Sequence, residues 1–294
     1  VARDALVRFT GCERVNVTIY EVGPRDGLQK IEEFIPTETK IDLINALYDA
    51  GLVHIEETSF AHPKYVPQMA DAEKVFQKGA VLVMNGRGLD RALAVGAEKI
   101  NIVYSPCEIF NINNMGMTRS EIVLMYHTIL SKIPKENVRV YISMAFGSPY
   151  SGIVSPMTMR SCLRDAKMFG NTVVFADTVG CGTRNEVALW AEMAHEEGLK
   201  PALHLHHKGD EEKALSLIKA GLLNRIYEFD SSIGGLGGCP FVENSGGNLA
   251  TETLVRHLEF WGFDCGVTED DLKPASLLAR KLVALEKRPK QTAK

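Results

Sequence analysis

Two histidines, His204 and His206, lie two positions apart in a short apolar stretch and could together bind a metal ion. Alternate residues of a β-strand point to the same side, so both imidazoles would project into one space. A carboxylate such as Asp26 could complete a facial set of two histidines and one carboxylate, which suits a divalent cation with open positions. The alternative is that both histidines only form hydrogen bonds at a strand end.

Further polar residues stand at the ends of other short apolar stretches, where they could bind or activate a substrate. In chain order they are Glu21, Arg25, Asp26, Glu56, Glu57, Thr58, Asp177, Thr178 and Asp230. Buried strands usually carry branched apolar residues, because burying a charged side chain costs free energy. So many charges at equivalent positions therefore indicate a site.

A glycine-rich segment, 234–240, carries Cys239 and precedes Asn248. Such a loop can bring backbone close to a ligand or form a flap, and an exposed thiol in it could donate a proton or act as a nucleophile. The alternative is a turn with an unreactive thiol. Asn248 could supply an amide oxygen to a metal ion, or it could cap the helix expected at 250–262.

The elements that must position these residues repeat one pattern, a short β-branched stretch followed by a turn and an amphipathic segment. Strands are expected at 15–21, 53–59, 80–84, 99–104, 138–145, 172–177, 202–206 and 225–230. Eight such units in roughly 250 residues are typical of a (β/α)8 TIM barrel, an α/β fold whose active site lies at the carboxyl ends of the strands. The rival, an open doubly wound sheet, requires a G-x-G-x-x-G turn after the first strand, and the sequence there reads GPRDG.

The chain is expected to form one domain over 1–294, with the barrel at about 15–262 and a short C-terminal helical extension at 263–294. Helices are predicted at 40–50 and 184–197, each followed by the glycine that favours a left-handed cap. Thr118 begins a capping box, whereas Met115 and Met117 are expected in a loop.

Composition excludes several classes of protein. The 294 residues carry 33 basic and 37 acidic side chains, a net charge of −4, so no basic field exists for nucleic acid. The apolar runs are too short to cross a bilayer. The six cysteines form no C-x-x-C pair, which disfavours structural zinc and fits a cytoplasmic protein. Because the chain does not start with Met, a trimmed organellar form stays open.

Several segments taken together resemble the 3-hydroxy-3-methylglutaryl-CoA (HMG-CoA) lyase family of the DRE-TIM metallolyase superfamily. They are EVGPRDGLQ at 21–29, IE at 55–56, TSF at 58–60, PK at 63–64, VPQM at 66–69, DT at 177–178, HLH at 204–206, GLGGCP at 235–240 and GNLATE at 247–252. The first segment and the cysteine loop are specific to the family, while HLH and DT occur across the superfamily. The resemblance runs from about 15 to 262.

This resemblance implies a carbon–carbon lyase that splits a 3-hydroxyacyl-CoA by retro-Claisen cleavage. The parent reaction turns HMG-CoA into acetyl-CoA and acetoacetate, as in leucine degradation. By motif matching, Mg²⁺ or Mn²⁺ would be bound by Asp26, His204, His206 and Asn248. Catalytic roles fall to Arg25, Asp26, Glu56, His204 and Cys239, with Arg25 neutralising the enolate. The implied substrate-binding residues are Arg25, Gln29, Asp177, Gly237 and Gly238.

The sequence also departs from the family. After His206 the family usually reads Asp-Thr-Tyr-Gly, whereas here 207–210 read HKGD, and Val174 stands where a serine is usual. A different 3-hydroxyacyl-CoA is therefore a second candidate substrate. The chain could also be a DRE-TIM aldolase or Claisen-condensing enzyme, although these enzymes usually carry an extra C-terminal domain, or a non-catalytic barrel that binds a CoA ester. Family likeness suggests a homodimer with a small acyl-CoA as its partner molecule.

Overall fold

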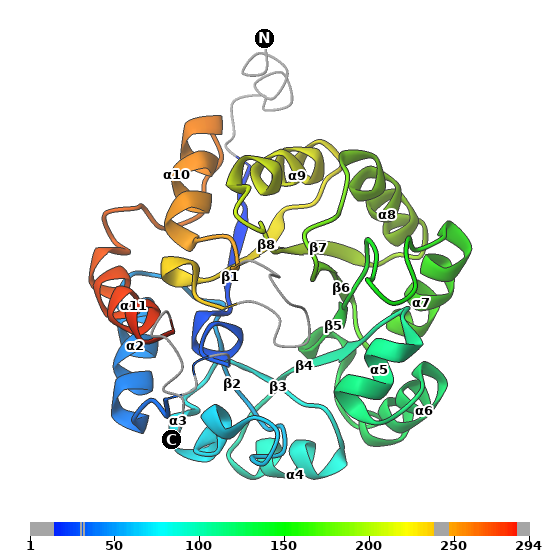
Figure 1. Ribbon diagram of the computed structural model, residues 1–294, viewed down its shortest axis with the longest axis horizontal. Helices are drawn as coiled ribbons and strands as arrows, with labels where there is room; N and C mark the ends of the chain where they lie inside the picture. The colour runs from blue at the N-terminus through cyan, green and yellow to red at the C-terminus, as the bar shows by residue number, and fades with distance from the viewer. Residues whose placement is uncertain (1–14, 30, 32, 238–246, 287–294) are drawn as a thin grey trace, which may run out of the picture.

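The computed structural model describes residues 15–29, 31, 33–237 and 247–286, and its centre is a barrel of eight parallel strands (Figure 1). The strands are β1 (Thr18–Glu21), β2 (Glu56–Ser59), β3 (Ala80–Leu82), β4 (Lys99–Tyr104), β5 (Val138–Ile142), β6 (Thr172–Asp177), β7 (Lys200–Leu205) and β8 (Glu228–Ser231). Their order in the sheet is β1-β8-β7-β6-β5-β4-β3-β2. A parallel bridge between Glu21 and Ile55 completes the barrel beside β2. The expected TIM barrel is confirmed.

Helices form a ring outside the strands (Figure 1). The α-helices are α2 (Thr37–Asp49), α3 (Ala72–Val75), α4 (Gly86–Ala94), α5 (Glu108–Met115), α6 (Arg119–Ile129), α7 (Pro156–Phe169), α8 (Arg184–Glu196), α9 (Glu211–Leu223), α10 (Thr251–Trp261) and α11 (Lys273–Glu286). Short turns of other helix types are η1 (Gly23–Gly27), η2 (Pro67–Met69), η3 (Lys135–Asn137) and η4 (Ile233–Gly235). Within the described residues, the helices are all too short or too polar to cross a membrane.

Local sequence signals explain where several helices begin. The capping box expected at Thr118 is present, since its hydroxyl accepts from the backbone of Glu121 while the Glu121 carboxylate accepts from the Thr118 backbone. An equivalent box at Thr183 begins α8. These reciprocal bonds satisfy N–H groups that a helix cannot bond internally.

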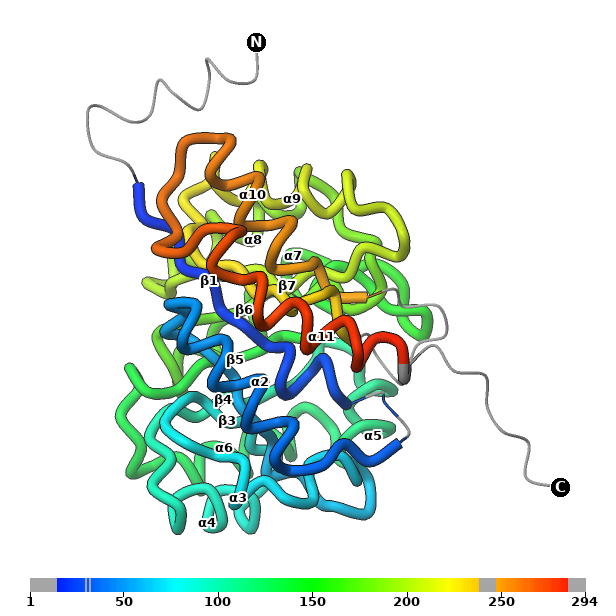
Figure 2. Tube along the Cα trace, turned by 90° about the vertical axis from the view of Figure 1, so that its left-hand side faces the viewer, coloured from blue at the N-terminus to red at the C-terminus, as the bar shows by residue number. Residues whose placement is uncertain are grey.

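The C-terminal extension covers a flank of the barrel beside the first strand. Its helix, α11, packs against α2 and η4. Helices α11 and α2 lie side by side in both views (Figures 1 and 2). Its packing residues Ala275, Ala279 and Leu282 are buried. The helix therefore supports η4, the turn from which the glycine-rich segment leaves β8.

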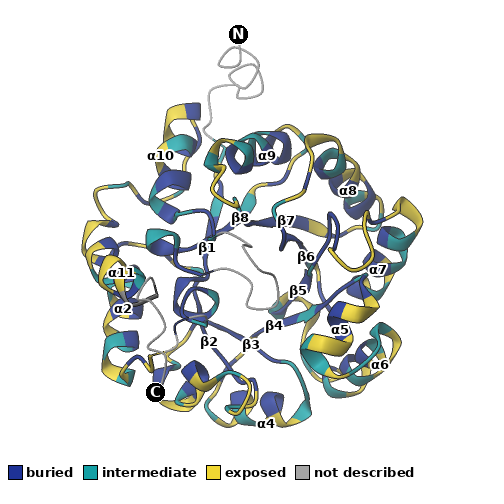
Figure 3. Cartoon of the chain, in the orientation of Figure 1, coloured by how far each residue is buried: buried dark blue, intermediate teal, exposed yellow. Residues whose placement is uncertain are grey.

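The barrel strands are buried along most of their length (Figure 3), and their interior carries a polar layer. This layer comprises Tyr20, Glu56, Asn101, Arg139, Tyr141, His204 and Asp230. Each polar group has partners within the layer, as where Asn101 accepts from the Tyr20 hydroxyl and donates to Glu56. Burying such groups costs free energy even when they are paired, so the layer indicates a functional requirement.

Some expected boundaries are wrong. Strand β8 starts at Glu228 rather than 225, because Arg225 has a φ of 61° and belongs to the turn after α9. Strand β1 starts at Thr18, and the preceding Asn16 only bridges to Asp264. Met115, expected in a loop, is the last residue of α5. The errors lie at strand and helix ends and do not move the candidate site.

Candidate metal centre

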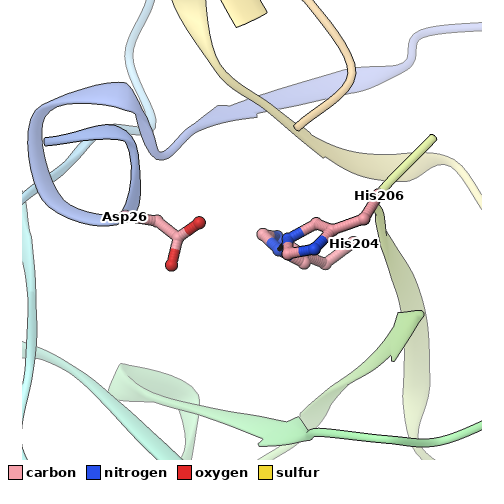
Figure 4. Close-up of side chains that lie close together, drawn as sticks. All are labelled: Asp26, His204 and His206. Carbon is pink, nitrogen blue, oxygen red and sulfur yellow. Dashed lines mark hydrogen bonds between the residues drawn. The ribbon is translucent and has the colours of Figure 1, made fainter. Parts of the chain in front are cut away.

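Three of the expected ligands meet at the carboxyl ends of the strands. One atom each from Asp26, His204 and His206 lies within 4.8 Å of the others (Figure 4). His204 lies in β7 and His206 directly follows that strand, so the two-residue period directs both rings to one side. Asp26 comes from η1, where the backbone N–H groups of Arg25, Asp26 and Gly27 all bond the carbonyl of Val22.

Hydrogen bonds on the far sides of the rings fix which nitrogen of each histidine faces the centre. His206 Nδ1 lies 3.1 Å from the carbonyl oxygen of Thr178, and His204 Nδ1 lies 3.1 Å from Asp230 Oδ2. Both partners are acceptors, so each Nδ1 carries a proton, and in the neutral form of each ring Nε2 presents a lone pair. The two Nε2 atoms are 3.1 Å apart. Two lone pairs at this distance repel each other, and a shared cation removes the repulsion.

The surrounding charges favour the ionised form of the acidic ligand. Burial would raise the pKa of Asp26, but the positive charge of Arg25 and the hydrogen bond from Asn248 help to lower it to about 2. Burial likewise opposes protonation of His204, yet the hydrogen bond and charge of Asp230 raise its pKa overall. Asp26 is thus a carboxylate at every physiological pH, as a metal ligand must be.

Asn248 provides a test of whether the site fits a metal ion. Its amide nitrogen donates to Asp26 Oδ2 at 2.8 Å and to the Leu236 carbonyl at 3.0 Å. Its carbonyl oxygen Oδ1 is buried and has no hydrogen-bond partner among the residues that the structure describes. An unsatisfied buried oxygen is costly, and an oxygen ligand of this kind suits Mg²⁺ or Mn²⁺. The N-cap of α10 is Ala250, so Asn248 does not serve as the cap.

Arg25 and Glu56 form a buried ion pair beside these ligands. Arg25 Nη1 donates to Asp26 Oδ1 at 2.7 Å, and Nε donates to Glu56 Oε2 at 2.5 Å. Asn101 holds the other oxygen of Glu56 at 2.8 Å. Burial raises the pKa of Glu56 by more than Arg25 and Asn101 lower it. The guanidinium is therefore held rigidly, next to the acidic ligand.

The glycine-rich segment approaches the centre at Gly237. A Cβ atom at this position would lie 2.8 Å from Asn248 Nδ2 and 3.0 Å from the backbone oxygen of Asp26. Gly237 also has a φ of 102°, a conformation that other residues rarely adopt. Only glycine allows the segment to contact two of the expected ligands. Gly238 and Cys239 lie outside the described residues.

The remaining candidates lie at turns around the centre. Gln29 is half-buried, and its backbone N–H bonds the Asp26 carbonyl at the end of η1. Asp177 accepts from the backbone N–H groups of Cys181 and Gly182, each at 2.9 Å, and burial raises its pKa. It thereby closes the turn that positions Thr178, the residue whose carbonyl orients His206.

Sequence reasoning missed two residues of the site. Arg139 and Tyr141, both on β5, contact the Asp230 carboxylate that orients His204. Asp230 itself is predicted from the sequence only as a polar residue at a strand end. The sequence signal that could have identified them is an arginine inside the otherwise apolar stretch VRVYI of β5. A buried arginine needs an acidic partner, so its position predicts a carboxylate nearby.

Comparisons with known proteins show which sequences and structures this chain resembles. The mitochondrial hydroxymethylglutaryl-CoA lyase of Macaca fascicularis is 36% identical over 271 residues, which cover 88% of this chain and 83% of that protein. The crystal structure of the HMG-CoA lyase from Brucella melitensis superposes with a TM-score of 0.85 at 34% identity, covering 91% of this chain and 99% of that one. An HMG-CoA lyase from Acinetobacter baumannii, in complex with coenzyme A and 3-methylmalate, gives a TM-score of 0.85 at 30% identity, covering 94% and 93%.

The family model described as HMGL-like matches residues 16–278, a span that includes all eight strands and every expected ligand. The expected family is therefore confirmed by sequence similarity over most of the chain and by the fold. This chain belongs to the HMGL-like family of the DRE-TIM superfamily.

Proposed function

We propose that this protein is a carbon–carbon lyase that cleaves HMG-CoA into acetyl-CoA and acetoacetate, with Mg²⁺ or Mn²⁺ bound by Asp26, His204, His206 and Asn248. The observation that carries the proposal is the convergence of these side chains beside Arg25, in a chain whose relatives are HMG-CoA lyases. The orphaned oxygen of Asn248 and the facing Nε2 atoms support a bound cation.

Retro-Claisen cleavage breaks the C2–C3 bond of the substrate, removes the proton of the C3 hydroxyl and leaves an electron pair on C2 as the enolate of acetyl-CoA. A divalent cation, when bound, polarises that hydroxyl. Arg25 supplies a positive charge for the thioester oxygen, where negative charge appears only as the bond breaks. Glu56 fixes the direction of the guanidinium through Nε, so little reorganisation is needed during the reaction.

The reaction also needs a base and an acid. The single lone pair of neutral His204, on Nε2, faces the centre, while its Nδ1 is bonded to Asp230. Both oxygens of Glu56 accept one hydrogen bond each, from Arg25 and Asn101, but each oxygen keeps a second lone pair. Asp26 is a weak base because its pKa is about 2. Burial raises the pKa of Glu56, so Glu56 is the proposed acceptor of the hydroxyl proton, directly or through water. Cys239 is proposed to return a proton to C2.

A related 3-hydroxyacyl-CoA is the second candidate substrate. Val174 packs with Tyr141 and Ala202 in a buried apolar cluster, and the Tyr141 ring lies 6.2 Å from the ring of His204. A valine there, in place of a serine, offers no hydrogen bond to a polar acyl group. Val174 is fully buried, so this departure from the family is a reason to test other 3-hydroxyacyl-CoA thioesters and does not define the acyl group.

The first experiment is to incubate the purified protein with HMG-CoA and Mg²⁺, with and without EDTA, and to measure acetyl-CoA release. Release that EDTA abolishes supports the proposal. Absence of release from protein shown to hold metal would contradict HMG-CoA as the substrate, and a panel of other 3-hydroxyacyl-CoA thioesters and 4-hydroxy-2-oxo acids would then identify the acyl group. Failure of every thioester, with binding of CoA esters intact, would favour a non-catalytic barrel.

Two further proposals concern assembly and compartment. A homodimer is proposed from family likeness, and sedimentation of the purified protein tests it. The names of the relatives include both mitochondrial and cytoplasmic lyases, so a cytoplasmic location stays a prediction.

A further inference from the structure

Asp230 lies at the centre of a buried polar cluster behind the candidate ligands. Its carboxylate accepts from His204 Nδ1 at 3.1 Å, from the Tyr141 hydroxyl at 2.8 Å and from Arg139 Nη2 at 2.5 Å. These groups come from β7, β5 and β8, and the Asp230 side chain is fully buried. Burying a carboxylate together with three donors in the barrel interior costs more desolvation free energy than apolar side chains of similar size would. This cost indicates that Asp230 has a role other than filling space.

The two carboxylate oxygens of Asp230 accept hydrogen bonds from different residues. Oδ1 accepts from Arg139, whereas Oδ2 accepts from both Tyr141 and His204. Arg139 is itself fixed, because it pairs with Glu228 and stacks at 4.0 Å over the ring of Tyr20. The carboxylate therefore cannot rotate, and Oδ2 stays directed at the His204 ring.

This contact decides which nitrogen of His204 carries the proton. A neutral imidazole has one N–H and one lone pair, and the two forms are similar in energy unless a neighbour selects between them. With the acceptor Oδ2 beside it, Nδ1 holds the proton and Nε2 keeps the lone pair that faces His206 Nε2 at 3.1 Å. The negative charge also makes Nε2 a stronger donor to a cation.

The two histidines are oriented by chemically different partners. His206 is oriented by the backbone carbonyl of Thr178, which carries no net charge and cannot be changed by a side-chain substitution. His204 is oriented by a carboxylate. Only the His204 contact therefore offers a residue whose replacement reverses the preferred tautomer while the ligand itself remains.

We propose that Asp230, clamped by Arg139 and Tyr141, is a positioning residue that sets the tautomer of His204 and strengthens its binding of a divalent cation. The proposal rests on the metal site of the proposed function and adds to it the group that prepares the site before metal enters. Asp230 acts through His204 and is assigned no contact with substrate.

Asp230→Asn tests the proposal sharply because an amide has only one acceptor oxygen. Arg139 donates to one side of the Asp230 side chain, and Tyr141 and His204 donate to the other. The single oxygen of asparagine should face Arg139, because a charged donor forms the stronger hydrogen bond. The NH₂ group then faces His204, so Nδ1 must accept and the proton moves to Nε2. We expect the Kd for Mn²⁺, measured by the electron paramagnetic resonance signal of free Mn²⁺, to rise about 10- to 100-fold.

A second readout needs neither metal nor substrate. In metal-free protein labelled with ¹⁵N-histidine, at an alkaline pH where the His204 ring is neutral, wild-type His204 should show the Nδ1-protonated form, and Asp230→Asn should show the Nε2-protonated form. The His204 signals are assigned with His204→Ala. Tyr141→Phe removes one donor and leaves the acceptor, so it should keep the wild-type tautomer and raise the Kd by less.

The matched control is Glu57→Gln, which changes another fully buried strand carboxylate. Glu57 accepts from the Tyr48 hydroxyl and from the backbone of Gln77 and Gly79, on the outer side of the barrel. We expect it to lower the melting temperature and leave the Kd for Mn²⁺ unchanged. If Glu57→Gln raised the Kd as much as Asp230→Asn, the effect would be loss of stability and the proposal would be wrong.

The remaining outcomes are also decisive. An unchanged tautomer together with an unchanged Kd in Asp230→Asn overturns the proposal. If Asp230→Asn does not fold, Tyr141→Phe decides, because no change in its Kd would overturn the clamp. Wild-type protein that binds Mn²⁺ but does not cleave HMG-CoA contradicts the proposed function and leaves this proposal in place, whereas wild-type protein that binds no Mn²⁺ contradicts both.

Discussion

Replacing Glu21 by glutamine should make the protein more stable above neutral pH. Glu21 is fully buried at the end of β1, where its carboxylate accepts from the backbone of Gly23 and Ile233 and from the Thr251 hydroxyl. Burial raises its pKa from 4.5 to about 7, because these donors offset only part of the lost solvation. Glutamine keeps an oxygen for the two backbone groups and offers its amide to Thr251.

The sign and size of the effect follow from the two pKa values. The folded-state pKa is the higher one, so the stability that Glu21 contributes is fully present below pH 4.5 and is lost as the pH rises through about 7. At about 1.4 kcal/mol for each pH unit between these values, the loss reaches about 3 kcal/mol in wild type. The neutral amide of Glu21→Gln does not undergo this loss.

The assay is urea unfolding of wild type and Glu21→Gln, with EDTA present, between about pH 5 and about pH 8. The difference in unfolding free energy should be small at the acidic end and should favour the variant by about 3 kcal/mol at the alkaline end. Glu98→Gln, at an exposed position, controls for the loss of one negative charge. A difference for Glu21→Gln that is the same at both ends would refute the reasoning.

Three further predictions concern the metal centre. His206→Ala should lose bound Mn²⁺ and turnover together, and a fully active variant that retains metal by elemental analysis would exclude His206 as a ligand. Gly237→Ala should raise the Kd for Mn²⁺, since its Cβ would lie 2.8 Å from Asn248 Nδ2, whereas Gly96→Ala, also at a positive φ but with open space around it, should lower only the melting temperature. Cys239→Ser should retain metal and lower kcat by a large factor, and unchanged kcat in steady-state assays would show that the thiol donates no proton.

The sequence predicts much of this architecture because the relevant signals are local. His204 and His206 are two residues apart on a strand, so their shared direction follows from strand geometry alone. The same rule separates Glu56 from Glu57, since neighbouring residues on a strand face opposite sides. Glu56 contacts Arg25 inside the barrel, while Glu57 contacts Tyr48 outside it.

The rest of the site depends on contacts between distant parts of the chain. Arg139 and Asp230 are 91 positions apart, so nothing near either residue shows that they pair. The orphaned oxygen of Asn248 is equally invisible in the sequence, which allows both a helix cap and a ligand at that position. Composition alone makes the glycine-rich segment recognisable, yet the role of Gly237 follows only from its distance to Asn248.

The proposed ligands come from distant parts of the chain, since Asn248 bonds Asp26 across 222 positions. During synthesis the first unit of the barrel leaves the ribosome long before the last. Asp26 is therefore synthesised well before His204, His206 and Asn248, the residues that lie beside it in the folded barrel. A cation that needs all of them would bind only the completed barrel and would stabilise it by an amount that grows with the logarithm of its free concentration. Metal supply in the cell would therefore control how much folded protein accumulates, in addition to how fast each molecule turns over.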